Sequence, residues 1–152
     1  MDCLHVAMAL MLLAGTQPLV LEHLVLDAPE GWVLENRRGP DFAVFYIRPP
    51  GEGPTSSIGV YLGNHASSFA PQSALRGEAI GLGLRKGNWR VWQETSANGP
   101  NTFHAEAILK RPFGVEPEYS THLHVFLRAA SLVELTSLQG IVRTLRPVTS
   151  RK

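Results

Sequence analysis

The segment 121–128, THLHVFLR, has an apolar side chain at every second position from Leu123 to Leu127, with histidines on either side of Leu123. Successive residues of a β-strand point to opposite faces of the sheet. The alternation therefore puts Leu123, Val125 and Leu127 on one face and His122 and His124 on the other. This pattern predicts a strand in a sheet that packs one face against a core.

Five other short segments have the β-branched and aromatic composition of strands. They are Leu24–Leu26, Phe42–Arg48, Ile58–Leu62, Trp89–Thr95 and Phe103–Leu109. Turn-forming residues separate them, such as Pro49-Pro50 and Asn98-Gly99-Pro100. The order predicts a hairpin from 42–48 and 58–62, followed by an antiparallel meander that ends with 121–128.

Two helices are predicted. Ser131 and Glu134 fit a capping box, and the apolar residues after them recur on one helical face until Pro147, which cannot continue a helix. A weaker helix is predicted over 71–86 from the spacing of Leu75, Ala79 and Leu82, although three glycines oppose it. The expected fold is α+β, a single antiparallel sheet packed by an amphipathic C-terminal helix and a weaker second helix.

The N-terminal segment contains an unbroken apolar run at residues 6–13, VAMALMLL, followed by small residues. The run is too short to span a bilayer, which needs about 20 apolar residues, and it suits the core of an export signal. We therefore expect a signal-like segment at 1–18, one domain at 19–148 and a tail at 149–152. The expected location is periplasmic or extracellular; if the run is instead a buried first helix, the protein is cytoplasmic.

Composition narrows the function classes. The 152 residues suit one domain, and a net charge of +1 supplies no strong field for nucleic acid or an anionic membrane. The basic pairs Arg37-Arg38, Lys110-Arg111 and Arg151-Lys152 most simply solvate turns and a terminus. An acidic partner surface would require them to cluster in space.

The local sequences Ala28-Pro29-Glu30-Gly31-Trp32 and 59–64 (GVYLGN), with this order of elements, resemble the PsbP-like (Mog/PsbP/DcrB) family. The resemblance covers roughly Leu24 to Leu145 and implies an α/β/α sandwich. Members of that family include photosystem accessory factors, a Ran-binding protein, bacterial envelope proteins and secretion-associated chaperones. It therefore implies an accessory or binding role, and it assigns no role to any single residue.

A metal site is the sharpest chemical hypothesis. If the strands at 103–109 and 121–128 form a hairpin in the right register, His104 and Glu106 join His122 and His124 on one polar face. Imidazole nitrogens and carboxylate oxygens are zinc ligands. A slip of one residue would move His104 to the other face, and the same side chains also suit the solvated side of a sheet. No H-E-x-x-H motif is present.

The familiar catalytic motifs are absent from the sequence. It contains no G-x-S-x-G, no phosphate-binding G-x-x-x-x-G-K-[ST], and only Cys3, which export would remove. We therefore expect a protein that is not an enzyme and needs no cofactor, with zinc as the alternative noted above.

Candidate binding residues are aromatic or lie in a polar loop. Trp89 and Trp92 are three positions apart, so a regular strand directs them to opposite faces. Burial in the core is the favoured interpretation, and contact with a partner is the alternative. The segment 64–69 contributes Asn64, His65 and Phe69, either as a recognition loop or as a packed surface loop.

Together these features predict an exported, non-catalytic accessory or binding protein with a protein partner. A role in envelope assembly, a chaperone-like role and an immunity-type role are all consistent with this prediction. The alternative is a metal-binding protein or metal-dependent hydrolase that uses the histidine-rich face. The sequence favours no nucleic-acid partner and no stable membrane span, and it leaves the oligomeric state and the identity of the partner open.

Overall fold

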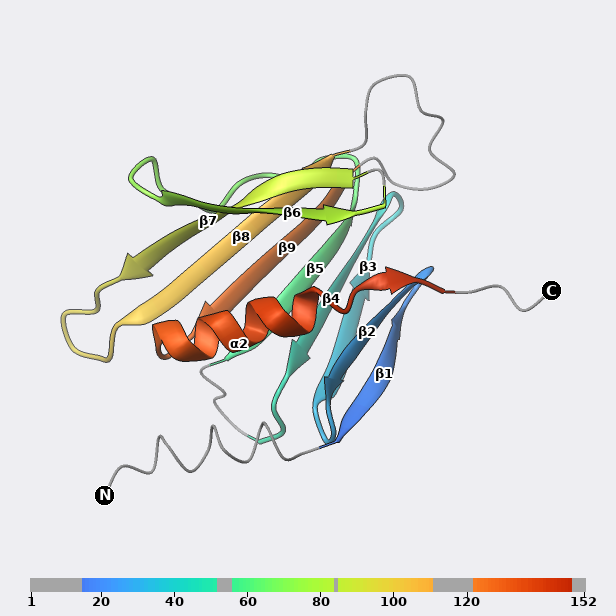
Figure 1. The fold of residues 1–152 in the computed structure, drawn as a ribbon, viewed down its shortest axis with the longest axis horizontal. Coiled ribbons are helices and arrows are strands. Elements are labelled where there is room, and N and C mark those ends of the chain that lie inside the picture. The colour runs from blue at the N-terminus through green and yellow to red at the C-terminus, as the bar shows by residue number, and fades with distance from the viewer. Residues whose placement is uncertain (1–14, 52–55, 84, 111–121, 149–152) are drawn as a thin grey trace.

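A computed structural model describes residues 15–51, 56–83, 85–110 and 122–148 of the chain. The elements are ten strands and one helix in these residues, and Figure 1 shows their arrangement. In chain order they are β1 (Thr16–Leu21), β2 (Leu24–Pro29), β3 (Val33–Arg38), β4 (Phe42–Arg48), β5 (Ser57–Gly63), β6 (Leu75–Leu82), β7 (Arg85–Glu94), β8 (Thr102–Lys110), β9 (His122–Ala129), α2 (Leu132–Val142) and β10 (Arg146–Pro147).

Seven strands form a large antiparallel sheet in the order β3-β4-β5-β9-β8-β7-β6. The predicted hairpin is confirmed as β4 and β5, and the predicted meander is confirmed as β7, β8 and β9. β9 is central, between β5 and β8. The alternating segment at 121–128 therefore occupies a strand with a neighbour on each side, from His122 onward.

The expectation of a single sheet is wrong. β1, β2 and β10 form a separate three-stranded sheet, in which β2 pairs with both of the others. Pro29 and Gly31 explain the break between the sheets: Gly31 has φ of +84°, and the Trp32 amide donates to the Pro29 carbonyl at 3.2 Å. This tight turn directs the chain from β2 into β3 of the other sheet, and Trp32 at its end is buried.

The helix expected over 71–86 is also wrong, because this region contains the edge strand β6. Gly77 and Gly81 lower helical propensity, and a side chain at Gly77 would lie 3.1 Å from the Cβ of Trp89 on β7. Gly83 has φ of +58°, which suits the turn between β6 and β7. Residues 75–82 therefore form a strand, because pairing with β7 and this turn stabilise it more than the helical spacing of the apolar residues would stabilise a helix.

The C-terminal helix is confirmed. Ser131 caps α2 and accepts a hydrogen bond from the Glu134 amide at 3.1 Å, while the Glu134 carboxylate accepts from the Ala130 amide and from Ser56 Oγ. The helix buries Leu135, Leu138 and Val142, as the spacing predicted, and the chain after it buries Leu145. Pro147 then lies in β10 rather than in a free tail.

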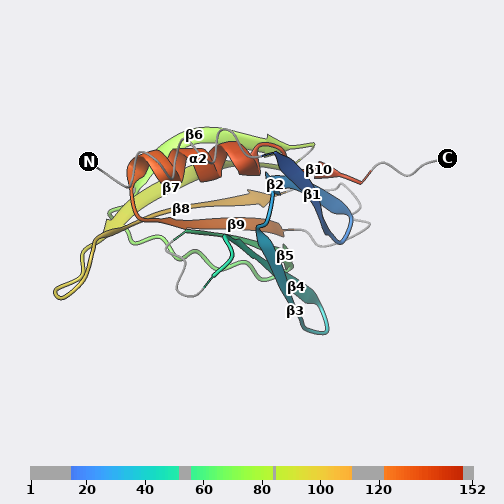
Figure 2. The same ribbon diagram turned by 90° about the horizontal axis from the view of Figure 1, so that it is seen from below.

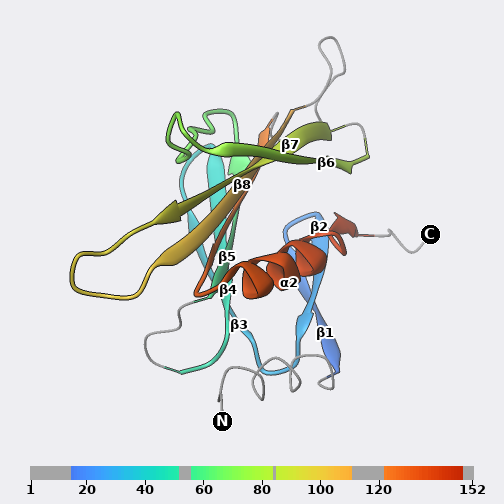
Figure 3. The same cartoon turned by 60° about the vertical axis from the view of Figure 1, so that its left-hand side comes forward.

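The two faces of the large sheet have different covers. We call the face that packs against α2 and the small sheet the inner face, and the opposite one the outer face; Figure 2 shows α2, β1, β2 and β10 all on the inner side. The sheet curls, so that β6 at one edge lies on the same side as α2 (Figures 2 and 3). Arg143 Nη2 contacts Glu78 of β6 at 3.0 Å and joins this edge to the end of the helix.

The core lies between the inner face and its cover. It contains residues of the large sheet such as Phe45, Ile47, Val60, Leu123 and Leu127, all at most 2% exposed. Trp89 is 1% exposed and belongs to the same core. In the residues that the structure describes, one helix covers one face, whereas the family resemblance implied helices on both.

The start of the domain differs slightly from the expected boundary. β1 begins at Thr16, and Gln17 Nε2 donates to the Trp32 carbonyl at 3.0 Å, so 16–18 belong to the small sheet. Residues 1–14 of the signal-like segment and 149–152 of the tail lie outside the described residues. Within those that are described, no helix has the length and apolar character needed to cross a bilayer.

Candidate functional site

The outer face carries the polar residues that the sequence singled out. β8 and β9 pair with Glu106 opposite Phe126 and Ile108 opposite His124, which puts His104, Glu106, His122 and His124 on one face. The register needed for the predicted polar face is therefore present.

Two of the four form a buried pair. His124 Nε2 lies 2.9 Å from Glu106 Oε2, and both residues are 2% exposed. A carboxylate in such a place must be satisfied by hydrogen bonds, because burying it without partners costs several kcal/mol. The partners come from a segment that lies far away in sequence.

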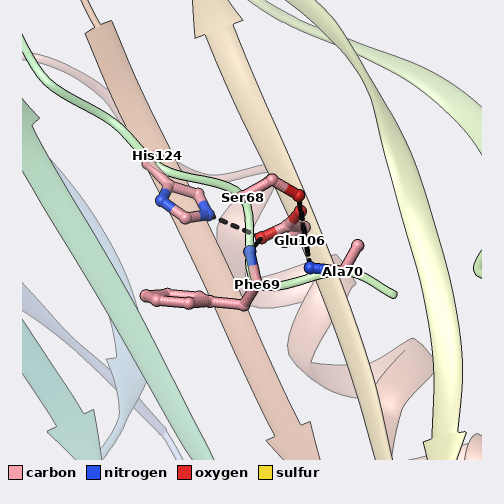
Figure 4. Close-up of polar contacts among 5 residues, drawn as sticks. All are labelled: Ser68, Phe69, Ala70, Glu106 and His124. Atoms are coloured by element: carbon pink, nitrogen blue, oxygen red, sulfur yellow. Dashed lines mark hydrogen bonds and ion pairs between the residues drawn. The ribbon is translucent and has the colours of Figure 1, made fainter. Parts of the chain in front are cut away.

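The segment 68–70, between β5 and β6, supplies the other donors. Glu106 accepts hydrogen bonds from Ser68 Oγ, from the Phe69 amide at 2.8 Å and from the Ala70 amide at 3.2 Å. Figure 4 shows this segment crossing β8 and β9 while Glu106 and His124 point toward it. The carboxylate therefore fastens the connecting segment to the outer face.

The protonation states follow from these contacts. Burial by itself raises the pKa of the Glu106 carboxyl, but hydrogen bonds from Ser68, Phe69, Ala70 and His124 outweigh burial and hold the pKa below its ordinary value. Burial lowers the pKa of His124, and Glu106 offsets this only in part. At neutral pH the pair is thus a carboxylate that accepts a hydrogen bond from a neutral imidazole.

This arrangement differs from a hydrolase triad. In such a triad the imidazole stands between the serine hydroxyl and the carboxylate, so that it can take the serine proton. Here the carboxylate stands between Ser68 and His124. Both oxygens of Glu106 already accept donors of the protein itself, and the geometry serves to hold the segment in place.

The other two predicted metal ligands have different neighbours. His104 contacts Glu94 at 3.3 Å and stacks on Trp92 with 5.3 Å between ring centroids. His122 lies opposite Lys110 at the end of the strands. Within the described residues, no group of three or more metal-ligating side chains could hold an ion. The four residues share a face without forming one site.

Further contacts fix the connecting segment at both ends. The His65 amide donates to the Tyr61 hydroxyl at 3.1 Å, and Arg90 Nη2 donates to the Pro71 carbonyl at 3.0 Å. With Glu106 in the middle, the segment from 65 to 71 is held at three places. Asn64, His65 and Phe69 are all exposed within or beside it, as a recognition loop requires.

Phe69 is held in place and yet is 60% exposed. Its ring lies 5.1 Å from the ring of His124 and 5.3 Å from that of Phe126, which in turn meets Tyr46 edge-on at 6.2 Å. Gly59 makes room for Phe126, because a Cβ there would collide with its ring. We call Tyr46, Phe126 and Phe69 the aromatic row.

The structure divides the predicted binding residues. Trp89 lies in the core and is unavailable to a partner, which corrects its place among the binding candidates. Trp92 is half-buried on the outer face. Sequence reasoning missed Ser68 as an anchor and Tyr46 and Phe126 as part of the surface. The single carboxylate in the otherwise apolar run 105–109 (AEAIL) was the available signal, since such a residue needs a partner.

Comparison with known proteins adds no relative to this description: no protein-family model matches the chain, and no curated protein matches it.

Proposed function

We propose that this protein is an exported, non-catalytic binding protein that recognises a partner protein through the outer face of its large sheet. The observation that supports this most directly is Glu106: a buried carboxylate with its acceptors taken up by Ser68, Phe69, Ala70 and His124. Those bonds hold Phe69 on the surface, where its ring is largely exposed.

A fixed, exposed aromatic side chain suits recognition of a protein. Aromatic residues are enriched at the centres of interfaces, and a side chain already ordered before binding loses less entropy when a partner arrives. Phe69 lies next to Phe126, which in turn meets Tyr46, so the apolar contact extends over neighbouring strands. The polar and charged groups around them resemble the rim of an interface.

Export belongs to the same proposal, and the start of β1 suggests where a signal would end. The Gly15 carbonyl accepts from the Glu30 amide at 2.9 Å, and β1 starts at the next residue. We expect processing before Gly15, which removes Cys3, keeps the acceptor of the Glu30 amide and leaves β1 intact. Intact-mass measurement of the protein from its native cell tests this; a cytoplasmic product that retains the first residues contradicts export.

The binding proposal is tested by capture from an envelope fraction with three forms of the full chain: wild type, Phe69→Ser and Leu132→Ser. Leu132 on α2 is the matched control, because it is 56% exposed and lies away from the outer face. We expect one set of proteins to be retained by wild type and by Leu132→Ser and to be lost with Phe69→Ser. Equal retention by all three forms contradicts the proposal.

A further inference from the structure

Positive charge is concentrated on the outer face of β6, β7, β8 and β9. The strand register puts five cationic side chains there, which we call the basic half: Arg76, Lys86, Arg90, Lys110 and Arg128. On these strands the same face carries the carboxylates of Glu106, which is buried, and Glu94, which contacts His104. Net charge of the whole chain, at +1, does not reveal this concentration.

The five cations are not neutralised by carboxylates in the described part of the chain. Arg76 donates to the Asn88 side-chain oxygen and Arg90 to the Pro71 carbonyl, both neutral acceptors. Arg90 is also the cross-strand neighbour of Glu106, but that carboxylate already accepts from Ser68, Phe69, Ala70 and His124. The ion pairs of the described residues involve other arginines, among them Arg38 with Glu22 and Arg143 with Glu78. Among the described residues, no carboxylate forms an ion pair with the basic half.

Several of these cations face one another directly. Arg76 is the cross-strand partner of Arg90, and Lys86 is the partner of Lys110. Directly opposed like charges destabilise an antiparallel sheet by tenths of a kcal/mol or more per pair. Lys110 is also opposite His122, where burial first and the lysine charge second lower the pKa of the imidazole. The free protein thus carries repulsion that an anionic partner would relieve.

We propose that the partner recognised by the outer face is an acidic protein segment, with carboxylates over the basic half and an apolar side chain against the aromatic row. This inference rests on the proposed function and specifies the chemistry of its partner. Arginine and lysine pair well with Asp and Glu, and arginine can hold a carboxylate by two parallel hydrogen bonds. Phe69, in the aromatic row, lies beside His124 on β9, one of the strands that carry the cations.

A single-stranded nucleic acid fits this face less well. Such ligands need aromatic rings with open faces on which successive bases stack. The rings of Phe69 and Phe126 meet at 84° and those of Tyr46 and Phe126 at 73°, so the three rings form no parallel platform for successive bases. Contacts with carboxylates and a single apolar side chain require no open platform.

The experiment measures binding of three fluorescent probes to the full chain: a short glutamate-rich peptide with one phenylalanine, the same peptide with glutamine for glutamate, and oligothymidylate. We expect salt-sensitive binding of the acidic peptide and weaker binding of the other two. Lys86→Gln/Lys110→Gln should weaken peptide binding about tenfold, as two lost ion pairs predict. The control Arg38→Gln/Arg143→Gln removes the same charge elsewhere and should change it less than about twofold.

Stability supplies an independent readout. The Lys86→Gln/Lys110→Gln variant should melt at a higher temperature than wild type while it binds the peptide more weakly, because the substitution removes opposed like charges. Unchanged peptide binding, an equal loss in the control, or tighter binding of oligothymidylate overturns the inference. If capture depends on Phe69 but these probes show no charge preference, the proposed function stands and only the acidic partner is rejected.

Discussion

The inner and outer faces of the seven-stranded sheet bury comparable aromatic and aliphatic residues in different ways. On the inner face, Phe45 and Leu127 are closed off by α2 and the small sheet and are at most 2% exposed. On the outer face, the cover is a connecting segment held by Glu106 and His124, and Phe69 remains 60% exposed. Apolar packing closes one face, and polar anchoring positions side chains on the other.

This difference between the faces explains why Glu106 and His124 are buried: they hold the connecting segment in place. A segment with few apolar side chains gains little free energy from burial, and its amide groups need acceptors. Glu106 provides those acceptors at Phe69 and Ala70. The same contacts leave the aromatic row accessible, and for that reason the outer face is the surface that we propose for recognition.

The largest loss of stability is expected from a substitution on the inner face. Phe45→Ala should lower the free energy of unfolding by about 4 kcal/mol, because it removes a fully buried ring and leaves a cavity. Urea denaturation measures this. Phe69→Ala is the matched substitution on the outer face, and its cost should stay below about 1 kcal/mol because most of its ring is already in water. Equal losses for the two variants would contradict the distinction between the faces.

Removing the Glu106 carboxylate, which holds the connecting segment on the outer face, should cause the second-largest loss of stability. Glu106→Gln keeps the size of the side chain but replaces the charged acceptor, and we expect a loss of about 2–3 kcal/mol. Hydrogen exchange of the Phe69 and Ala70 amides should accelerate, because both lose a charged acceptor. Glu94→Gln is the control, since that side chain is 65% exposed and should change stability little. Unaltered exchange at Phe69 would show that Glu106 does not hold the segment.

A smaller effect on stability is expected when pH is lowered, because His124 on the outer face is buried. The pKa of His124 is lowered in the folded protein by burial, so below its ordinary value of 6.5 the unfolded chain binds more protons than the folded one. Stability should therefore fall as pH decreases from about 6.5, by at most about 1.4 kcal/mol per pH unit from one group. The effect ends once pH has passed below the folded-state pKa.

His104 and His122 have lowered pKa values as well and add to the same trend. His124→Gln keeps a donor for Glu106 and should make the dependence of unfolding free energy on pH shallower between pH 7 and 5. The pKa of Glu106 is also lowered, so a further loss is expected as pH falls below about 4.5. An identical slope in His124→Gln and wild type would mean that this histidine does not titrate differently on unfolding.

Local patterns predicted much of the fold. Period-two alternation identified β9, and β-branched and aromatic composition identified β4, β5 and β8, because each reflects a strand that buries one side. The capping box and apolar spacing identified α2. The segment 71–86 was misassigned because its apolar residues fit helical spacing, whereas the glycines and the pairing with β7 decide for a strand.

The candidate site was predictable only in part, because some of its contacts follow from local patterns and others join distant segments. Sharing of a face by Glu106 and His124 follows from strand periodicity and the register of one hairpin. Their contact with Ser68, Phe69 and Ala70 joins residues more than thirty positions apart, and no local pattern encodes it. Likewise, spacing directed Trp89 and Trp92 to opposite faces, but it did not say which face is closed.

By itself, the sequence determined the strands of the hairpin and the meander, the C-terminal helix and the polar face of β9, because these depend on side-chain periodicity within short segments. The tertiary structure decided that β1, β2 and β10 form a second sheet, that Glu106 holds the segment at 68–70, and that cations from four strands share one face. Strand order and register decide which distant residues become neighbours, and pairing between segments far apart in the chain sets both.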